Sequence, residues 1–166
     1  QVSYLPDRMY FADWMKATDL FDLFRDFYQD FDYDKALAMC RSLGVEPKDR
    51  LKSMSKGTKE KVQLVLVMAR KARLYLLDEP IAGVDPAARD FILHTILTNY
   101  NEDGTVLIST HLIADIEKVL DEVIFLKSGR IMLHSTVDDI RERQGKSVDA
   151  LFREIFRTQP MEGGLY

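Results

Sequence analysis

Apolar residues recur along the chain at spacings that predict its helices and strands. Residues 2–5 alternate and stop at a proline, which predicts a short strand. The next apolar residues recur at helical spacing as far as Phe31, and Asp13 or Thr18 is the expected N-cap of this first helix. A second helix is expected from about residue 34 to residue 43, because Gly44 then ends it.

The second half of the sequence alternates between strand and helix. A third helix follows Gly57 and precedes a short apolar strand at 74–77. Asp85-Pro86 predicts the start of another helix, with aspartate as N-cap and proline at the first helical position. A second apolar strand at 106–108 is followed by an amphipathic helix over 112–120. Apolar strands that alternate with helices predict an α/β fold whose parallel sheet is covered on both faces.

The remaining residues predict a hairpin, from 123–126 and 131–133, and a helical tail. The long helical stretch before the first apolar strand predicts a helical insertion in the α/β core. We therefore expect four segments: a strand and following loop at 1–11, a helical subdomain at 12–60, an α/β core at 61–136 and a C-terminal helical tail at 137–166.

Composition narrows the class of protein. The 166 residues carry a net charge of −4, so composition alone gives no indication of nucleic-acid binding. Cys40 is the only cysteine, which excludes an internal disulfide and a cysteine-rich metal site. No apolar run approaches the roughly 20 residues that span a bilayer.

Two carboxylates at the end of the first apolar strand of the α/β core are the first candidates for chemistry. Ligands bind beyond the carboxyl ends of parallel strands, where Asp78 and Glu79 would lie. One of them can hold a magnesium ion through water, and the other can polarise an attacking water as a general base. The alternative is that the pair is a solvated turn.

Five stretches, one of which contains this pair, occur in one order along the chain: Tyr4-Leu5-Pro6-Asp7, Met54-Ser55-Lys56-Gly57-Thr58, Leu74 to Glu79, Ala82-Gly83-Val84-Asp85 and Ser109-Thr110-His111. This series resembles the nucleotide-binding domain of ATP-binding-cassette (ABC) transporters. The resemblance puts Met54 to Thr58 in the place of the signature, Leu74 to Asp78 in that of the Walker B strand with its magnesium aspartate Asp78, Ala82 to Asp85 in that of the D-loop, and His111 in that of the switch histidine. The tail and the Ser-Lys-Gly signature look closest to bacterial ABC-2-type exporters. The resemblance implies a P-loop NTPase-like sheet flanked by helices.

The resemblance assigns a role to each motif. Glu79 matches the catalytic glutamate, and His111 the histidine that contacts the γ-phosphate or the attacking water. In the family the signature, here with Ser55, Lys56 and Gly57, addresses the ATP of the opposite subunit. A helix N-terminus suits that task, because its free N–H groups and dipole favour an anion. The implied cofactors are ATP and Mg²⁺.

Some of these residues have simpler explanations or depart from the family pattern. Ser55 and Asp85 are also good N-caps, and His111 can be a structural cap. The resemblance gives Asp85 a part in coupling two subunits, not in catalysis. Lys56 replaces the first glycine of the signature and adds a positive charge beside the phosphate site. Asp7 stands where many relatives have a glutamine that senses magnesium, so it is a candidate for a water-mediated magnesium contact.

A phosphate-binding loop of the form Gly-x-x-x-x-Gly-Lys-Ser/Thr is not found. Gly145-Lys146-Ser147 matches its end, but Ile140 stands at the first glycine position and the context is helical, so we interpret the match as chance. In the family this loop precedes the position of Tyr4. We therefore expect a fragment that lacks the Walker A region and is inactive alone.

The interpretation is an ATPase subunit that drives export through a separate membrane permease by ATP-dependent dimerisation. Its expected partners are a second nucleotide-binding domain and the permease, with no nucleic acid, at the inner face of the cell membrane. Tyr10, Phe11, Trp14 and Met15 suit a groove for a permease helix, or are core of the helical insertion. The alternatives are a soluble ABC-type ATPase that acts on ribosomes or DNA, and a non-catalytic interaction fragment.

Overall fold

The computed structural model describes residues 1–157 and divides the chain into two compact units. The first is Gln1–His111 and the second begins at Leu112. None of the described helices is both long and apolar enough to cross a lipid bilayer.

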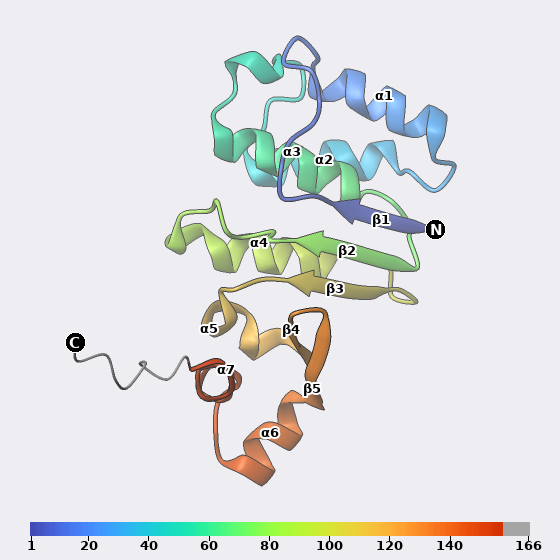
Figure 1. Ribbon diagram of the computed structural model, residues 1–166. Helices are drawn as coiled ribbons and strands as arrows, with labels where there is room; N and C mark the ends of the chain where they lie inside the picture. Colours follow the sequence, from blue (N-terminus) through green and yellow to red (C-terminus); the bar gives the residue numbers. More distant parts are fainter. Residues whose placement is uncertain (158–166) are drawn as a thin grey trace, which may run out of the picture. The chain divides into compact units, whose positions relative to one another are not determined.

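The first unit is built on a parallel sheet of three strands, in the order β1-β2-β3. Its strands are β1 (Val2–Leu5), β2 (Leu74–Asp78) and β3 (Thr105–Ser109), and they lie side by side in Figure 1. The three strands and their parallel arrangement were predicted from the sequence. The register brings the carboxyl ends of β2 and β3 together, since Asp78 pairs with Ser109.

Helices cover one face of this sheet. Tyr75 and Leu77 of β2 are fully buried, and Ser3 of β1 donates a hydrogen bond of 2.9 Å to the carbonyl oxygen of Val67 in α3 (Lys56–Met68). Helix α4 (Pro86–Asn99) passes behind β2 and β3 in Figure 1.

The other face of the sheet departs from the expectation. Val2, Tyr4 and Leu107 point to it and are 48%, 53% and 51% exposed. These side chains alternate with the buried ones because successive residues of a strand face opposite sides. Within the first unit, the prediction of a sheet covered on both faces is therefore wrong for this face.

The helical subdomain consists of α1 (Ala17–Phe27), α2 (Tyr33–Leu43), a short 3₁₀ turn η1 (Leu51–Ser53) and α3. Gly44 ends α2 with φ of 67°, as predicted. The predicted N-caps of α1 are wrong, because Lys16 is the N-cap and its backbone N–H donates to Asp19. Asp13 instead accepts a hydrogen bond of 2.6 Å from Lys59.

Arg70 joins the helical subdomain to the sheet. Its guanidinium donates to both carboxylate oxygens of Asp30, at 2.8 and 2.9 Å, and to the carbonyl oxygen of Val2 at 2.8 Å. The same group lies 3.8 Å from the ring centroid of Tyr28. Removing one partner would leave a buried charge unpaired, so this cluster fixes the end of α3 against β1.

The second unit contains a hairpin and short helices. Strands β4 (Glu122–Lys127) and β5 (Arg130–Thr136) pair in antiparallel fashion, and the turn residues Ser128 and Gly129 have φ of 49° and 75°. Positive φ at both positions matches the turn that two-residue hairpins prefer. Two further helices are α6 (Val137–Gln144) and α7 (Val148–Phe156).

In this unit one sequence prediction, the helix over 112–120, is corrected, and another, the helix break at 145–147, agrees with the structure. The helix predicted over 112–120 is shorter: α5 (Ile113–Ile116) passes into a 3₁₀ turn, η2 (Glu117–Val119), because Leu120 must be extended to enter β4. The interpretation of Gly145-Lys146-Ser147 agrees with the structure. Gly145 ends α6 and Ser147 is the N-cap of α7, so the three residues are a break between helices.

Candidate functional site

The candidate site begins at the carboxyl ends of β2 and β3. Asp78 is the last residue of β2, and its Oδ1 accepts a short hydrogen bond from the hydroxyl of Ser109, the last residue of β3. This bond fixes the orientation of the carboxylate and does not involve its second oxygen, Oδ2.

Glu79 turns out of the sheet in an unusual backbone conformation. Its φ is 48°, a value that costs a residue other than glycine on the order of 1 kcal/mol. The backbone N–H of Glu79 still donates to the carbonyl oxygen of Ser109 at 2.9 Å, so the pairing with β3 continues past the end of β2. The strained residue is thus held by the sheet itself.

Both carboxylate oxygens of Glu79 have donors in the loop after β3. The hydroxyl of Thr110 donates to Oε2 at 3.0 Å. The backbone N–H of His111 donates to Oε1 at 3.2 Å, and its ring nitrogen Nδ1 lies 2.6 Å from the same oxygen. The structure therefore brings the two predicted catalytic residues together, with the carboxylate 24% and the imidazole 69% exposed.

The N-terminus of α3 carries the predicted signature residues. Ser55 is the N-cap, and its hydroxyl accepts from the backbone N–H of Thr58 at 3.1 Å, so its expected capping role is met. A side chain at Gly57 would meet nothing within 4 Å. Lys56 is 85% exposed, and its ammonium lies 3.8 Å from Glu60. The helix end therefore presents backbone N–H groups and a positive charge to open space.

A buried glutamine holds the loop that carries Asp7. The amide of Gln63 in α3 is 4% exposed and donates to the carbonyl oxygens of Pro6 and Arg8, at 3.2 and 3.4 Å. Asp7 is bracketed by these bonds and is itself exposed. The sequence analysis missed Gln63, although a lone amide in the apolar run from Val62 to Met68 was a usable signal.

These elements enclose a cavity of about 410 Å³ within the first unit. Its lining comes from the acid pair, the signature residues, the loop after β1 and the loop after β2. His111 is not part of the lining. Of the eight residues predicted for the site, seven line this cavity: Asp7, Ser55, Lys56, Gly57, Asp78, Glu79 and Asp85. Asp85 is also the N-cap of α4, as predicted, and accepts from the backbone N–H of Ala87 at 2.9 Å.

Glu60 is a second residue of the cavity that the sequence analysis did not single out. Its Oε2 is buried and has no hydrogen-bond partner within residues 1–157. The carboxylate lies against Gly83, where an added Cβ would be 2.5 Å from Oε1. A glycine at position 83 therefore lets the helix α3 and the loop after β2 approach each other closely.

The donor set fits a magnesium ion that keeps most of its water. Among residues 1–157 there is no cluster of three or more histidine, cysteine or carboxylate side chains suited to a metal. Magnesium in nucleotide sites is commonly held by one or two carboxylates together with phosphate oxygens and water. Asp78, fixed by Ser109 at the strand end, can supply one such carboxylate.

Comparisons with known proteins identify relatives of this chain. A family model described as "AAA domain, putative AbiEii toxin, Type IV TA system" matches residues 10–114. The ABC transporter ATP-binding protein YtrB of Bacillus subtilis is 28% identical, over 85% of this chain and 49% of its own length. The phosphonates import ATP-binding protein PhnC 2 of Halalkalibacterium halodurans is 30% identical, over 76% of this chain and 52% of its own length.

A solved structure agrees with these relatives. An ATP-binding subunit of an ABC transporter superposes with a TM-score of 0.79 and 28% identity, over 93% of this chain and 68% of that one. The chain spans about half the length of the curated relatives it matches. It carries an AAA-type domain and belongs to the family of ABC transporter ATP-binding proteins.

Proposed function

We propose that the whole protein is the ATP-hydrolysing subunit of an ABC transporter and drives export through a separate membrane permease. The observation that supports this most is the network at the ends of β2 and β3. It holds a strained Glu79 between Thr110 and His111, beside an Asp78 fixed by Ser109. A general base must be held near the water it deprotonates, and the fixed position of the Glu79 carboxylate supports that role.

The proposed roles divide between two walls of the cavity: the acid wall, with Asp78 and Glu79, and the helix wall, with Ser55, Lys56 and Gly57. Glu79 accepts the proton of the attacking water, and His111 orients the carboxylate or the γ-phosphate. Asp78 holds Mg²⁺ through water, with Asp7 as a second candidate contact. Magnesium, when bound, neutralises charge that develops on the phosphates.

The opposite wall would act in a dimer. Ser55, Lys56 and Gly57 would bind the γ-phosphate of ATP held by a second nucleotide-binding domain, with Asp85 coupling the two subunits. Open space at Gly57 and the exposed charge of Lys56 support this proposal. Both walls would then be needed for one turnover.

The permease partner and the direction of transport are also proposals. Tyr10 is 63% exposed, as a docking surface for a permease helix requires. Phe11 instead packs on Tyr10 and Phe24, so these aromatic residues divide between surface and core. Export, at the inner face of the cell membrane, is proposed from the Ser-Lys-Gly signature and the tail, although one named relative is an importer.

The test uses the full-length protein with ATP. We expect phosphate release that needs Mg²⁺. We also expect dimers that form only with nucleotide, detected by light scattering. Asp78→Asn keeps the hydrogen bond from Ser109 but removes the charge, so it should raise the magnesium concentration needed for half-maximal turnover by about tenfold. Turnover that is absent, or the same in magnesium and in chelator, would contradict the proposal.

A further inference from the structure

A second, shallow pocket of the first unit is lined mainly by cations and shares no lining residue with the cavity of the candidate site. Its volume is about 610 Å³, and its lining residues come from the start of α1 and the connector before α3: Lys16, Lys48, Asp49, Arg50, Lys52 and Ser53. We call it the basic pocket. Four of its six residues are cationic, and Asp49 is its single carboxylate.

Backbone pairing brings these cations together from two segments. Lys16 and Arg50 form an isolated antiparallel bridge. The N–H of Leu51 donates to the carbonyl oxygen of Met15, and the N–H of Lys52 to that of Asp13, both at 2.8 Å. The backbone positions of Lys16, Arg50 and Lys52 are thus set by the fold, whereas their side chains can adjust.

No ion pair within the described residues neutralises the cations of the basic pocket. Within residues 1–157 no salt bridge involves Lys16, Lys48, Arg50 or Lys52. The whole sequence is acidic, with a net charge of −4. A local excess of unpaired cations on an acidic protein orients it toward an anionic partner.

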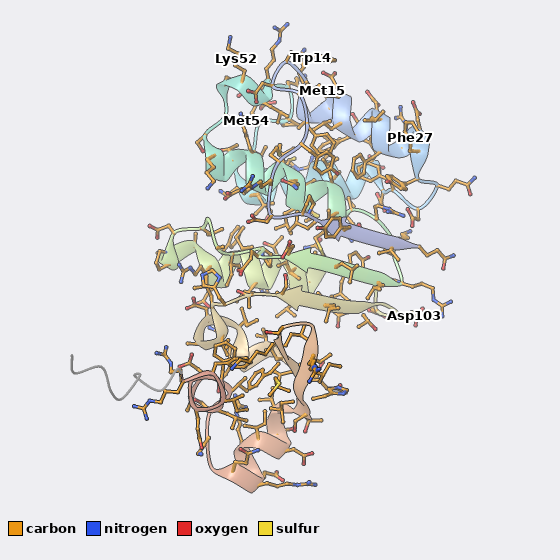
Figure 2. All side chains as sticks on the ribbon, viewed as in Figure 1. Trp14, Met15, Phe27, Lys52, Met54 and Asp103 are labelled. Atoms are coloured by element: carbon orange, nitrogen blue, oxygen red, sulfur yellow. The ribbon has the colours of Figure 1, made fainter. Side chains whose placement is uncertain are left out.

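An exposed tryptophan adjoins the basic pocket. Trp14 lies between Asp13 and Met15, the two residues that pair with the connector, and is 68% exposed. Figure 2 shows Trp14 and Lys52 projecting from the same end of the helical subdomain. Tryptophan beside lysine and arginine is typical of surfaces that meet the headgroup layer of a membrane.

We propose that the basic pocket binds the phosphate of anionic phospholipid headgroups, with Trp14 entering the interface beside it. Three of the four cations are lysines, which meet phosphate as flexible point charges and suit headgroups in varied positions. An acidic protein segment would use the same charges but has no need of the exposed indole. This inference rests on the proposed function in one respect, since a permease subunit stands next to lipid.

Trp14 is the only tryptophan of the chain, so its fluorescence reports directly on this surface. The protein is titrated with vesicles of phosphatidylcholine alone and with vesicles that also contain phosphatidylglycerol. We expect a blue shift and co-sedimentation only with the second kind, weakening as salt is added. Equal binding to both vesicles would overturn the proposal.

A charge-matched pair of variants locates the binding. Lys16→Gln, Lys48→Gln, Arg50→Gln and Lys52→Gln combined should weaken vesicle binding at least about tenfold, since each cation near an anionic surface contributes roughly fivefold. The control removes four exposed cations elsewhere, by Arg41→Gln, Lys71→Gln, Arg73→Gln and Arg130→Gln. It should stay within about twofold of the parent on the same scale. Circular dichroism verifies that both variants are folded.

Soluble anions distinguish the source of the phosphate. Glycerol phosphate and polyglutamate are added at the charge concentration of the vesicles. A response of Trp14 to glycerol phosphate equal to that with vesicles would show a free-phosphate site, and one to polyglutamate an acidic protein partner. Either result, or a control variant that loses as much binding as the pocket variant, overturns the proposal. No nucleotide or permease is present, so a failure here is distinct from failure of the proposed ATPase.

Discussion

On one wall of the main cavity, every carboxylate oxygen of Glu79 already has a donor from Thr110 or His111. On the other wall, Ser55 is bonded within its own helix, Gly57 borders open space and Lys56 is 85% exposed. Hydrogen bonds within residues 1–157 fix the acid wall, whereas the helix wall is open at Gly57 and Lys56, which the proposed function assigns to a second subunit's ATP. Changes to the first should therefore affect the chemical step, and changes to the second should affect association.

The largest expected effect is that of Glu79→Gln in the full-length protein. Glutamine keeps the size of the side chain but loses the basic charge, so turnover should fall at least about 100-fold. ATP binding should survive and ATP-dependent dimers should accumulate, as measured by phosphate release and light scattering.

Glu122→Gln is the matched control for this substitution. Glu122 also pairs with a histidine, His134, at 2.7 Å, but on the hairpin of the second unit. Its turnover should equal that of the parent. A near-parental rate for Glu79→Gln would show that the base is elsewhere, and His111 would be the next residue to replace.

Ser55→Ala should act on the helix wall. Loss of the N-cap costs about 1 kcal/mol of stability, and the helix end presents its N–H groups less precisely. We expect ATP-dependent dimerisation to weaken several-fold, measured by light scattering over a range of protein concentrations.

Ser147→Ala separates stability from association. Ser147 caps α7 with the same geometry, accepting from a backbone N–H at 3.1 Å as Ser55 does. It should cost similar stability and leave dimerisation unchanged. Equal weakening of dimers by both substitutions would mean that Ser55 acts only as a cap.

Thr110→Val should have a smaller effect on the acid wall. The substitution keeps the shape of the side chain and removes the donor to Oε2 of Glu79, while Glu79 keeps its contacts with His111. We expect turnover to fall by about tenfold, the equivalent of one hydrogen bond to a charged group. Thr110→Ser retains the hydroxyl and should restore most of the rate, so two variants with equal rates would contradict this role.

Local signals in the sequence were sufficient for much of the fold and of the candidate site. The caps at Ser55 and Asp85 and the αL glycine at Gly44 were predicted because their hydrogen bonds and backbone conformations depend on a few neighbouring residues. The acid pair was placed at the end of β2 because a short apolar strand precedes it.

Features that depend on packing were not predicted. Lys16 is the N-cap of α1 although lysine carries no capping signal, because residues 13–16 pair with the connector before α3. Glu60 was missed because its contact with Gly83 appears only when α3 lies against the loop after β2, and the lone amide of Gln63 indicated burial but not which loop it holds. The exposed Leu107 face could not be recognised either, since an apolar strand has the same sequence pattern whether one face or both are covered.

The smallest expected effect concerns the contact between the two walls, at Gly83. A methyl group there would be 2.5 Å from Oε1 of Glu60, so Gly83→Ala must displace this flexible carboxylate, at a cost of about 1 kcal/mol. Glu60→Ala alone should be close to neutral, because it also removes a buried oxygen without a partner. Combined, the two changes should show a coupling of about 0.5–1 kcal/mol, measured by urea unfolding followed through Trp14. Gly57→Ala combined with Glu60→Ala is the control cycle, since a methyl group at Gly57 meets nothing within 4 Å. Additive free energies in the Gly83 cycle would show that the two walls are not coupled through this contact.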